Sequence, residues 1–258
     1  MIALTLGLAA MPRVSQAGEH YDVALISGGL VNGSWRAGLV IDLEVGWKTY
    51  WRVPGEAGIP PEFNWSKSQN LGGVDVFWPA PKRYRDAGGE AIGYHDQVVF
   101  PLRVKAKDQE KPVTLTLDLF FAVCKDICLP VTVHASLAQP AASPDPAEAD
   151  LIAAFAARVP VPVDSASAGR VTAATVDEIN GGPALRLEFA GDIWSDAFDI
   201  FVEGGGLAYF RAPRRGASAR EVYLPIDGLK RRDDLGGKSL LLTLVSGDTR
   251  LEQSVSVT

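Results

Sequence analysis

The residues best suited to covalent chemistry in this chain are its two cysteines, Cys124 and Cys128, in the segment FFAVCKDICLPVTVH. A thiolate is a strong nucleophile, and two nearby cysteines can alternate between a dithiol and a disulfide. The disulfide would close a very short loop, so it would stabilise the fold little through loop entropy. The spacing leaves three alternatives open: a structural disulfide, a redox-active pair, or part of a metal site.

A metal site would need further ligands, for which His134, His95 and Met11 are the candidates. Zinc ribbons use four ligands, commonly two Cys-x-x-Cys pairs, and copper carriers offer more soft ligands than this chain contains. The composition therefore supports a metal site less than a disulfide. Thiol–disulfide exchange itself needs no bound cofactor and no metal.

The segments that flank the cysteines alternate between apolar and polar residues, as β-strands do. A strand over residues 113–123 and a returning strand over residues 129–137 would form a hairpin, with a cysteine at each end of its turn. Facing Cα atoms in an antiparallel pair lie about 4.5–5.5 Å apart, which a disulfide can span. The sequence therefore predicts that this hairpin positions the two sulfur atoms.

The rest of the first half has the same β character. Further strands are expected at residues 21–27, 35–45, 74–78 and 98–106, with glycine- and proline-rich turns between them. Short alternating strands separated by such turns are typical of an antiparallel sandwich. The sequence predicts an all-β fold in which residues 18–138 form an immunoglobulin-like β-sandwich domain.

A change of composition follows, because residues 138–150 are rich in proline, alanine and aspartate. We expect a linker over residues 139–169, with a short helix near residues 147–158. A second, smaller β-sandwich domain is predicted over residues 170–258. Its expected strands are 171–176, 184–189, 198–202, 221–224, 240–245 and 251–257. This half contains no cysteine and no histidine, which favours a packing or docking role.

The first residues, MIALTLGLAAMPRVSQAGEH, are typical of a signal peptide over residues 1–17, with cleavage after Ala17. No later stretch approaches the roughly 18–20 apolar residues that span a bilayer. The formal net charge is −6, and no basic face stands out, so a nucleic-acid partner is not expected. We expect a protein exported to an oxidising compartment, where two cysteines tend to pair.

Residues 21–140 resemble the amino-terminal periplasmic domain of the DsbD/ScsB family of thiol:disulfide interchange proteins. The resemblance depends on the order of four segments: GWKTYWRVPGEAGIPPEF (46–63), VFWPAPKRY (76–84), GGEAIGYHDQVVFPLRV (88–104) and FFAVCKDICLP (120–130). It implies an immunoglobulin-like fold whose redox pair is Cys124 and Cys128. The short cysteine spacing is nearer to the ScsB-like branch.

The family resemblance also implies partners and a periplasmic location. In that family the domain takes electrons from a membrane-embedded thiol–disulfide reductase and passes them to soluble periplasmic thioredoxin-fold proteins, in routes that include cytochrome c biogenesis. This chain has no membrane-spanning segment and no Cys-x-x-Cys thioredoxin domain of its own. Either a separate membrane protein reduces it, or the chain is a shortened member of the family.

The family shields its cysteines with a cap loop that opens for partners, and residues 88–96 are the matching segment. The resemblance assigns Tyr94 and His95 to this cap. A lid of this kind would limit nonspecific oxidation of a dithiol. The residues themselves leave another interpretation open, in which Tyr94 is a core-edge aromatic and His95 faces solvent.

Other polar and aromatic residues near these motifs have two interpretations each. Trp47, Tyr50 and Trp51 either pack beneath the cysteines or belong to the sandwich core. Glu56 and Asp86 either steer proton transfer or are surface charges. The sequence as a whole predicts a periplasmic thiol:disulfide oxidoreductase that relays electrons. The alternative is a non-enzymatic interaction or chaperone-like module with a permanent disulfide.

Overall fold

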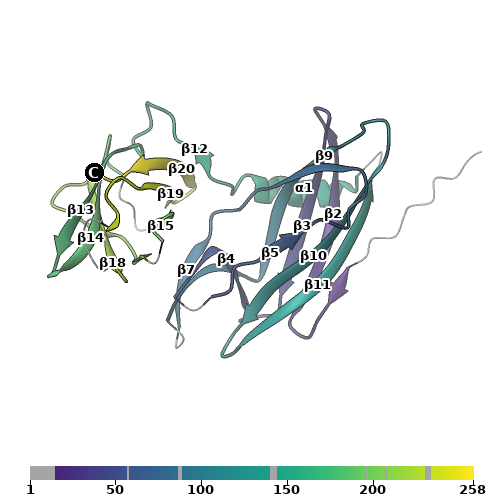
Figure 1. Ribbon diagram of the computed structural model, residues 1–258, viewed down its shortest axis with the longest axis horizontal. Coiled ribbons are helices and arrows are strands. Elements are labelled where there is room, and N and C mark those ends of the chain that lie inside the picture. The colour runs from purple at the N-terminus through teal and green to yellow at the C-terminus, as the bar shows by residue number, and fades with distance from the viewer. Residues whose placement is uncertain are drawn as a thin grey trace, which may run out of the picture. The chain divides into compact units, whose positions relative to one another are not determined.

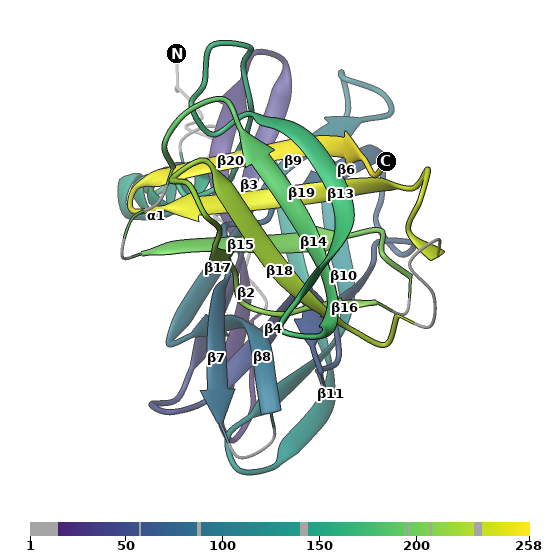
Figure 2. The ribbon, with the colours of Figure 1, turned by 90° about the vertical axis from the view of Figure 1, so that its left-hand side faces the viewer.

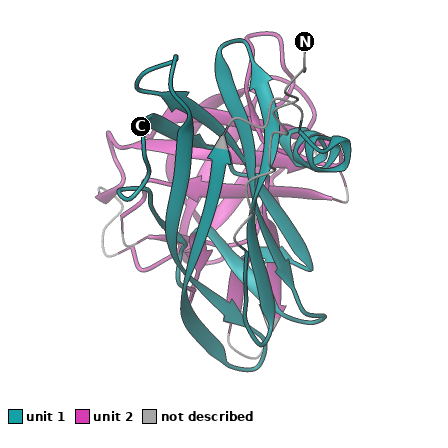
Figure 3. Ribbon diagram, turned by 90° about the vertical axis from the view of Figure 1, so that its right-hand side faces the viewer, with its two compact units in different colours: residues 1–52, 59–79, 93–157 teal, residues 53–58, 80–92, 158–258 magenta. Residues whose placement is uncertain are grey.

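The structure is a computed structural model dominated by β-strands, with one α-helix in the described part of the chain (Figure 1). The chain separates into two compact units, and each unit is discontinuous in sequence (Figure 3). Unit 1 comprises residues 1–52, 59–79 and 93–157, and unit 2 comprises residues 53–58, 80–92 and 158–258. The structure describes residues 15–56, 58–86, 89–139, 144–193, 195, 197–206, 208–229 and 234–258.

The first sheet of unit 1 has the strand order β1-β2-β3-β9-β6. Its strands are β1 (Gln16–Ala17), β2 (Tyr21–Val31), β3 (Ser34–Leu43), β9 (Gln97–Ala106) and β6 (Leu71–Val76). The hairpin between β2 and β3 turns at Asn32 and Gly33, whose φ angles are 50° and 74°. Asn-Gly is a preferred pair for such a turn, because both residues tolerate positive φ.

The second sheet has the order β11-β10-β4-β8-β7, and β5 pairs with β10 beside it. Its strands are β4 (Lys48–Gly55), β5 (Glu62–Asn64), β7 (Lys82–Asp86), β8 (Gly89–His95), β10 (Val113–Cys124) and β11 (Cys128–Gln139). Strands β4 and β8 each have residues in both units, and the described residues of β7 belong to unit 2.

Strand β10 shows why these residues form a sandwich. Leu115, Leu117, Leu119 and Phe121 are fully buried, and the residues between them are only partly buried. Full burial of a large apolar side chain contributes about 1.5–3 kcal/mol, so this alternation fixes which face of β10 points to the core. The predicted all-β, immunoglobulin-like sandwich is confirmed, and the predicted hairpin is present as β10 and β11.

The helix α1 (Pro146–Ala156) packs against β2 and β9 of unit 1 (Figure 1). Asp145 caps its first turn, because the side chain accepts a hydrogen bond of 2.9 Å from the backbone N–H of Ala147. Gly38 of β3 makes room for the helix, since a Cβ there would lie 2.8 Å from Cγ1 of Ile152. The predicted short helix is therefore present, and it is docked on unit 1.

The C-terminal part of unit 2 forms two further sheets, with the orders β12-β20-β19-β15 and β13-β14-β18-β16 (Figure 2). Strand β17 pairs with β18. The strands are β12 (Val161–Pro162), β13 (Val171–Ile179), β14 (Gly182–Phe189), β15 (Phe198–Glu203), β16 (Tyr209–Phe210), β17 (Arg214–Arg215), β18 (Glu221–Asp227), β19 (Ser239–Ser246) and β20 (Thr249–Ser256). Each of the six strands predicted in this half is present with shifted ends.

The predicted division at residues 18–138, 139–169 and 170–258 stays a prediction. Most of the predicted signal peptide lies outside the described residues. Its predicted cleavage site directly follows β1, whose Gln16 pairs with Val23 of β2. No helix in the described ranges has the length and apolar character needed to cross a membrane.

Candidate active site

The two cysteines lie at the turn between β10 and β11. Strand β10 ends at Cys124 and β11 begins at Cys128, and the strand register places the two residues opposite each other. Their sulfur atoms form a disulfide, and their Cα atoms are 4.2 Å apart. The turn is closed by a hydrogen bond of 3.1 Å from the N–H of Lys125 to the carbonyl of Ile127. The hairpin geometry alone thus brings the sulfur atoms together.

The two cysteines differ sharply in their exposure to solvent. Cys124 has an exposed fraction of 0%, whereas Cys128 is exposed, and its neighbour Ile127 is 63% exposed. Strand β4 accounts for part of this difference, because its Lys48 pairs with Cys124 at the end of β10. Thr49 adds a hydrogen bond of 2.9 Å to the carbonyl of Ala122. An approaching molecule therefore meets Cys128 first.

A buried tyrosine connects β4 to both sulfur atoms. The hydroxyl of Tyr50 donates a hydrogen bond of 3.0 Å to Sγ of Cys124 and lies 3.3 Å from Sγ of Cys128. Tyr50 is only 3% exposed, so this hydroxyl is held away from bulk water. A hydrogen bond to a charged form favours that form. The arrangement can therefore stabilise negative charge on a sulfur atom when the disulfide opens.

Strand β8 passes very close to the backbone of Tyr50. A Cβ atom at Gly93 would lie 2.0 Å from the carbonyl oxygen of Thr49 and 2.9 Å from Cα of Tyr50. Only glycine fits such an approach without displacing one of the two strands. The position of Tyr50 thus depends on the path of β8.

A second turn, over residues 44–47, lies next to the cysteine turn. Gly46 has a φ of 85°, and a Cβ there would be 3.2 Å from Cε of Lys125. Trp47 stacks on His20 with ring centroids 3.8 Å apart, and Nδ1 of His20 is 2.6 Å from Oε2 of Glu44. These contacts hold the 44–47 turn next to Lys125 of the cysteine turn.

The segment predicted as a cap loop has a different conformation, because residues 89–95 form strand β8. Tyr94 is buried, its hydroxyl donates a hydrogen bond of 2.7 Å to the carbonyl of Pro79, and its ring meets Phe100 edge-on at 5.7 Å. Tyr94 is thus a core aromatic, and His95 ends the strand. The cap role of Tyr94 and His95 stays a prediction.

The structure also places the other residues for which the sequence left two interpretations open. Tyr50 lies against the cysteines, whereas Trp47 and Trp51 are both buried, with His20 stacked on Trp47 and Arg52 over the ring of Trp51 at 4.7 Å. Glu56 lies in unit 2, and its carboxylate accepts a hydrogen bond of 2.8 Å from Arg211. The side chain of Asp86 is outside the described residues.

The candidate metal ligands do not gather around the cysteines in the described part of the chain. His134 instead places Nδ1 2.5 Å from Oδ1 of Asp118, its partner across β10 and β11. Met11 falls outside the described residues. Among the residues that the structure describes, no group of three or more histidine, cysteine, aspartate or glutamate side chains could hold a metal ion.

Comparison with known proteins agrees with this geometry. Residues 25–140 match the family model described as the N-terminal part of the thiol:disulfide interchange protein DsbD. The crystal structure of the N-terminal periplasmic domain of ScsB from Proteus mirabilis is similar, with a TM-score of 0.73 and 25% sequence identity. The alignment covers 95% of this chain and 96% of that chain. No curated protein sequence matches the chain. Residues 25–140 are therefore similar to the N-terminal domain of the DsbD/ScsB family of thiol:disulfide interchange proteins, and the ScsB structure extends the similarity to most of the chain.

Proposed function

We propose that the protein is a thiol:disulfide oxidoreductase whose Cys124 and Cys128 alternate between disulfide and dithiol. The observation that carries the proposal is the asymmetry of the disulfide. One cysteine is exposed at a turn, and the other is buried beside the hydroxyl of Tyr50. The match of residues 25–140 to a thiol:disulfide interchange family supports the same proposal.

The first step is attack on the exposed sulfur. A thiolate of a reducing partner attacks Sγ of Cys128, a new S–S bond forms, and the bond between Cys128 and Cys124 breaks. The sulfur of Cys124 leaves with the electron pair. Tyr50 already donates a hydrogen bond to that sulfur, so the departing charge has a partner as it develops.

The second step releases the partner. The partner's second thiolate attacks the partner's first sulfur atom, which is bonded to Sγ of Cys128. Cys128 then leaves as a thiolate. The pair has then gained two electrons, the partner has become a disulfide, and protons from solvent complete the thiols. Electrons pass onward by the reverse sequence, in which Cys128 attacks an acceptor disulfide and Cys124 resolves the mixed disulfide.

The electron donor in this proposal is a membrane-embedded thiol–disulfide reductase, and the acceptors are soluble thioredoxin-fold proteins. Both assignments rest on the family, as does the periplasmic location after cleavage of a signal peptide. The related ScsB domain is described as periplasmic, which supports that location. A part in cytochrome c biogenesis stays a prediction.

The test is the reduction potential of the cysteine pair, measured by trapping thiols across a series of dithiothreitol or glutathione ratios. A potential of about −180 to −270 mV lies in the range of exchange proteins and is the expected result. A value below about −300 mV is typical of structural disulfides and would favour the interaction module with a permanent bridge.

A further inference from the structure

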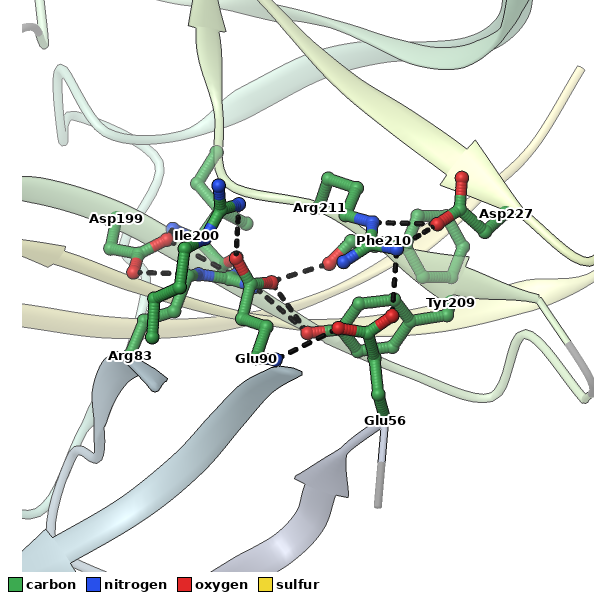
Figure 4. A network of polar contacts seen from close by, with 10 residues as sticks. Glu56, Arg83, Glu90, Asp199, Ile200, Tyr209, Phe210, Arg211 and Asp227 are labelled. Atoms are coloured by element: carbon green, nitrogen blue, oxygen red, sulfur yellow. Dashed lines mark hydrogen bonds and ion pairs between the residues drawn. The ribbon is translucent and has the colours of Figure 1, made fainter. Parts of the chain in front are cut away.

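Three charged residues of the N-terminal motifs have no part in the exchange chemistry. They are Glu56 in GEAG, Arg83 in PKRY and Glu90 in GGEAIG, and all three belong to unit 2. Figure 4 shows them in one polar network with residues from the C-terminal strands. We call this network the clamp, and its members are Glu56, Arg83, Glu90, Asp199, Tyr209, Arg211 and Asp227.

Arg83 is the centre of the clamp and is almost fully buried, with 9% of its side chain exposed. Its guanidinium holds Asp199 with two hydrogen bonds of 3.1 and 3.2 Å and Glu90 with one of 2.5 Å. It also donates to the carbonyls of Ile200 at 3.1 Å and Phe210 at 3.3 Å. A planar guanidinium bound on several sides fixes orientation as well as distance.

Glu90 extends the clamp into strand β8. Its side chain is 3% exposed, and Oε1 accepts both the bond from Arg83 and one of 2.5 Å from the hydroxyl of Tyr209. Its backbone is held as well, since its N–H donates to Oε2 of Glu56 at 2.8 Å and its carbonyl accepts from the N–H of Glu56 at 3.0 Å. Arg211 completes this side by donating to Oε1 of Glu56 at 2.8 Å.

Two glycines of the same motifs make these contacts possible. A Cβ at Gly55, where φ is 98°, would lie 2.4 Å from the carbonyl oxygen of Glu90. A Cβ at Gly89, where φ is 110°, would lie 2.9 Å from Oε2 of Glu56. Both positions combine a left-handed backbone with a close approach, so both favour glycine. The charged residues of these motifs form the clamp, and the glycines leave the space that it needs.

We propose that the clamp is a positioning device for the redox pair, and that the C-terminal strands act on the cysteines through β8. This inference rests on the proposed function and adds a role for the C-terminal half. Strand β8 carries Glu90 in the clamp and, three residues further on, Gly93 against the backbone of Tyr50. Tyr50 in turn donates to the buried sulfur.

The chemistry of the clamp favours positioning over simple stabilisation. A buried ion-pair network is often no more stabilising than apolar residues of the same size, because its charges must be desolvated. Its directional bonds do, however, select one arrangement of the strands that they join. Here the bonds fix the backbone position of β8 at Glu90. Because β8 is continuous, they also restrict the position of Gly93.

The test is a double-mutant cycle in the full chain, read as the rate at which dithiothreitol reduces the disulfide. Arg83→Gln is expected to slow reduction by about 3- to 10-fold, the loss expected for one hydrogen bond to the leaving sulfur. Tyr50→Phe is expected to slow it by a similar factor. If the clamp acts through Tyr50, then Arg83→Gln has no further effect in the Tyr50→Phe background.

The control is Arg186→Gln, which breaks another arginine–glutamate ion pair of unit 2, with Glu221 at 2.6 Å, and should leave the rate unchanged. If Arg83→Gln does not fold, Tyr209→Phe replaces it, because that change removes one hydroxyl from Glu90. An unchanged rate in the clamp variants overturns the proposal, and so does an equal slowing in the Tyr50→Phe background. The reduction potential of the unsubstituted protein tests the proposed function separately, since the cycle compares rates only.

Discussion

The hydroxyl of Tyr50 lies 3.0 Å from Sγ of Cys124, on the buried side of a disulfide whose other cysteine is exposed. This contact joins β4 to the end of β10 at the disulfide. In the proposed exchange reaction, one sulfur atom is open to attack and the other is supported as a leaving group.

Tyr50→Phe removes the donor while keeping the ring that fills the space. We expect reduction of the disulfide by dithiothreitol to slow by about 3- to 10-fold, since one hydrogen bond to a developing charge is lost. The rate is followed by quenching with an alkylating reagent. Thermal unfolding of the oxidised protein serves as the control for the fold, and an unchanged rate would show that the hydroxyl has no part in the chemistry.

The exposure of the two cysteines predicts which one traps a partner. In Cys124→Ser the remaining thiol is the exposed Cys128, which should form a mixed disulfide rapidly with an aromatic disulfide reagent. In Cys128→Ser the remaining thiol is the buried Cys124, and we expect a rate lower by roughly tenfold or more because access is blocked. Absorbance of the released aromatic thiol gives both rates. Equal rates would contradict the assignment of Cys128 as the attacked sulfur.

Gly93→Ala tests the close approach of β8 to β4. The added Cβ would lie 2.0 Å from the carbonyl oxygen of Thr49, so one strand must move. We expect the free energy of unfolding to fall by about 1–3 kcal/mol, as for other overpacked sites, measured by urea denaturation. Gly73→Ala in β6 is the matched control, because a Cβ there meets nothing within 4 Å. A similar loss in both variants would point to strand propensity instead.

The contacts of Glu56 in the clamp predict that the stability of the fold depends on pH. Hydrogen bonds from Arg211 and from the backbone of Glu90 hold the pKa of Glu56 below its ordinary value. A carboxyl whose folded pKa is lowered adds stability that is present above its unfolded pKa of about 4.3 and is lost as the pH falls through the folded value. We therefore expect stability to drop below about pH 4, and we expect Glu56→Gln to flatten this drop. Urea denaturation from pH 6 downward measures both profiles, and parallel profiles would contradict the assignment.

The cysteine hairpin could be predicted from the sequence, because the strand pattern lies within the segments that form β10 and β11. The apolar residues of β10 alternate without interruption up to Phe121, and the turn residues separate two such runs. Helix α1 was likewise predictable from a local change of composition that begins at a proline and an acidic cap.

Strands β4, β7 and β8 were missed, and they carry Tyr50, Arg83 and Glu90. Pro54 and Gly55 are typical turn residues, yet β4 continues through both. Glu90 is a charge in a buried strand, and it is stable there because of Arg83 and Tyr209. A local window cannot anticipate a partner such as Tyr209, which is 119 residues away.

The discontinuity of unit 2 sets an order of events for a chain that emerges from its N-terminus. Arg83 and Asp199 are 116 residues apart, so the hairpin of β7 and β8 appears long before its acidic partner. Loop-closure entropy grows only with the logarithm of this separation, so the long separation adds little to the free-energy cost of bringing the two residues together. It does leave a charged hairpin incompletely paired during synthesis, until the strands that carry Asp199 and Tyr209 have been made.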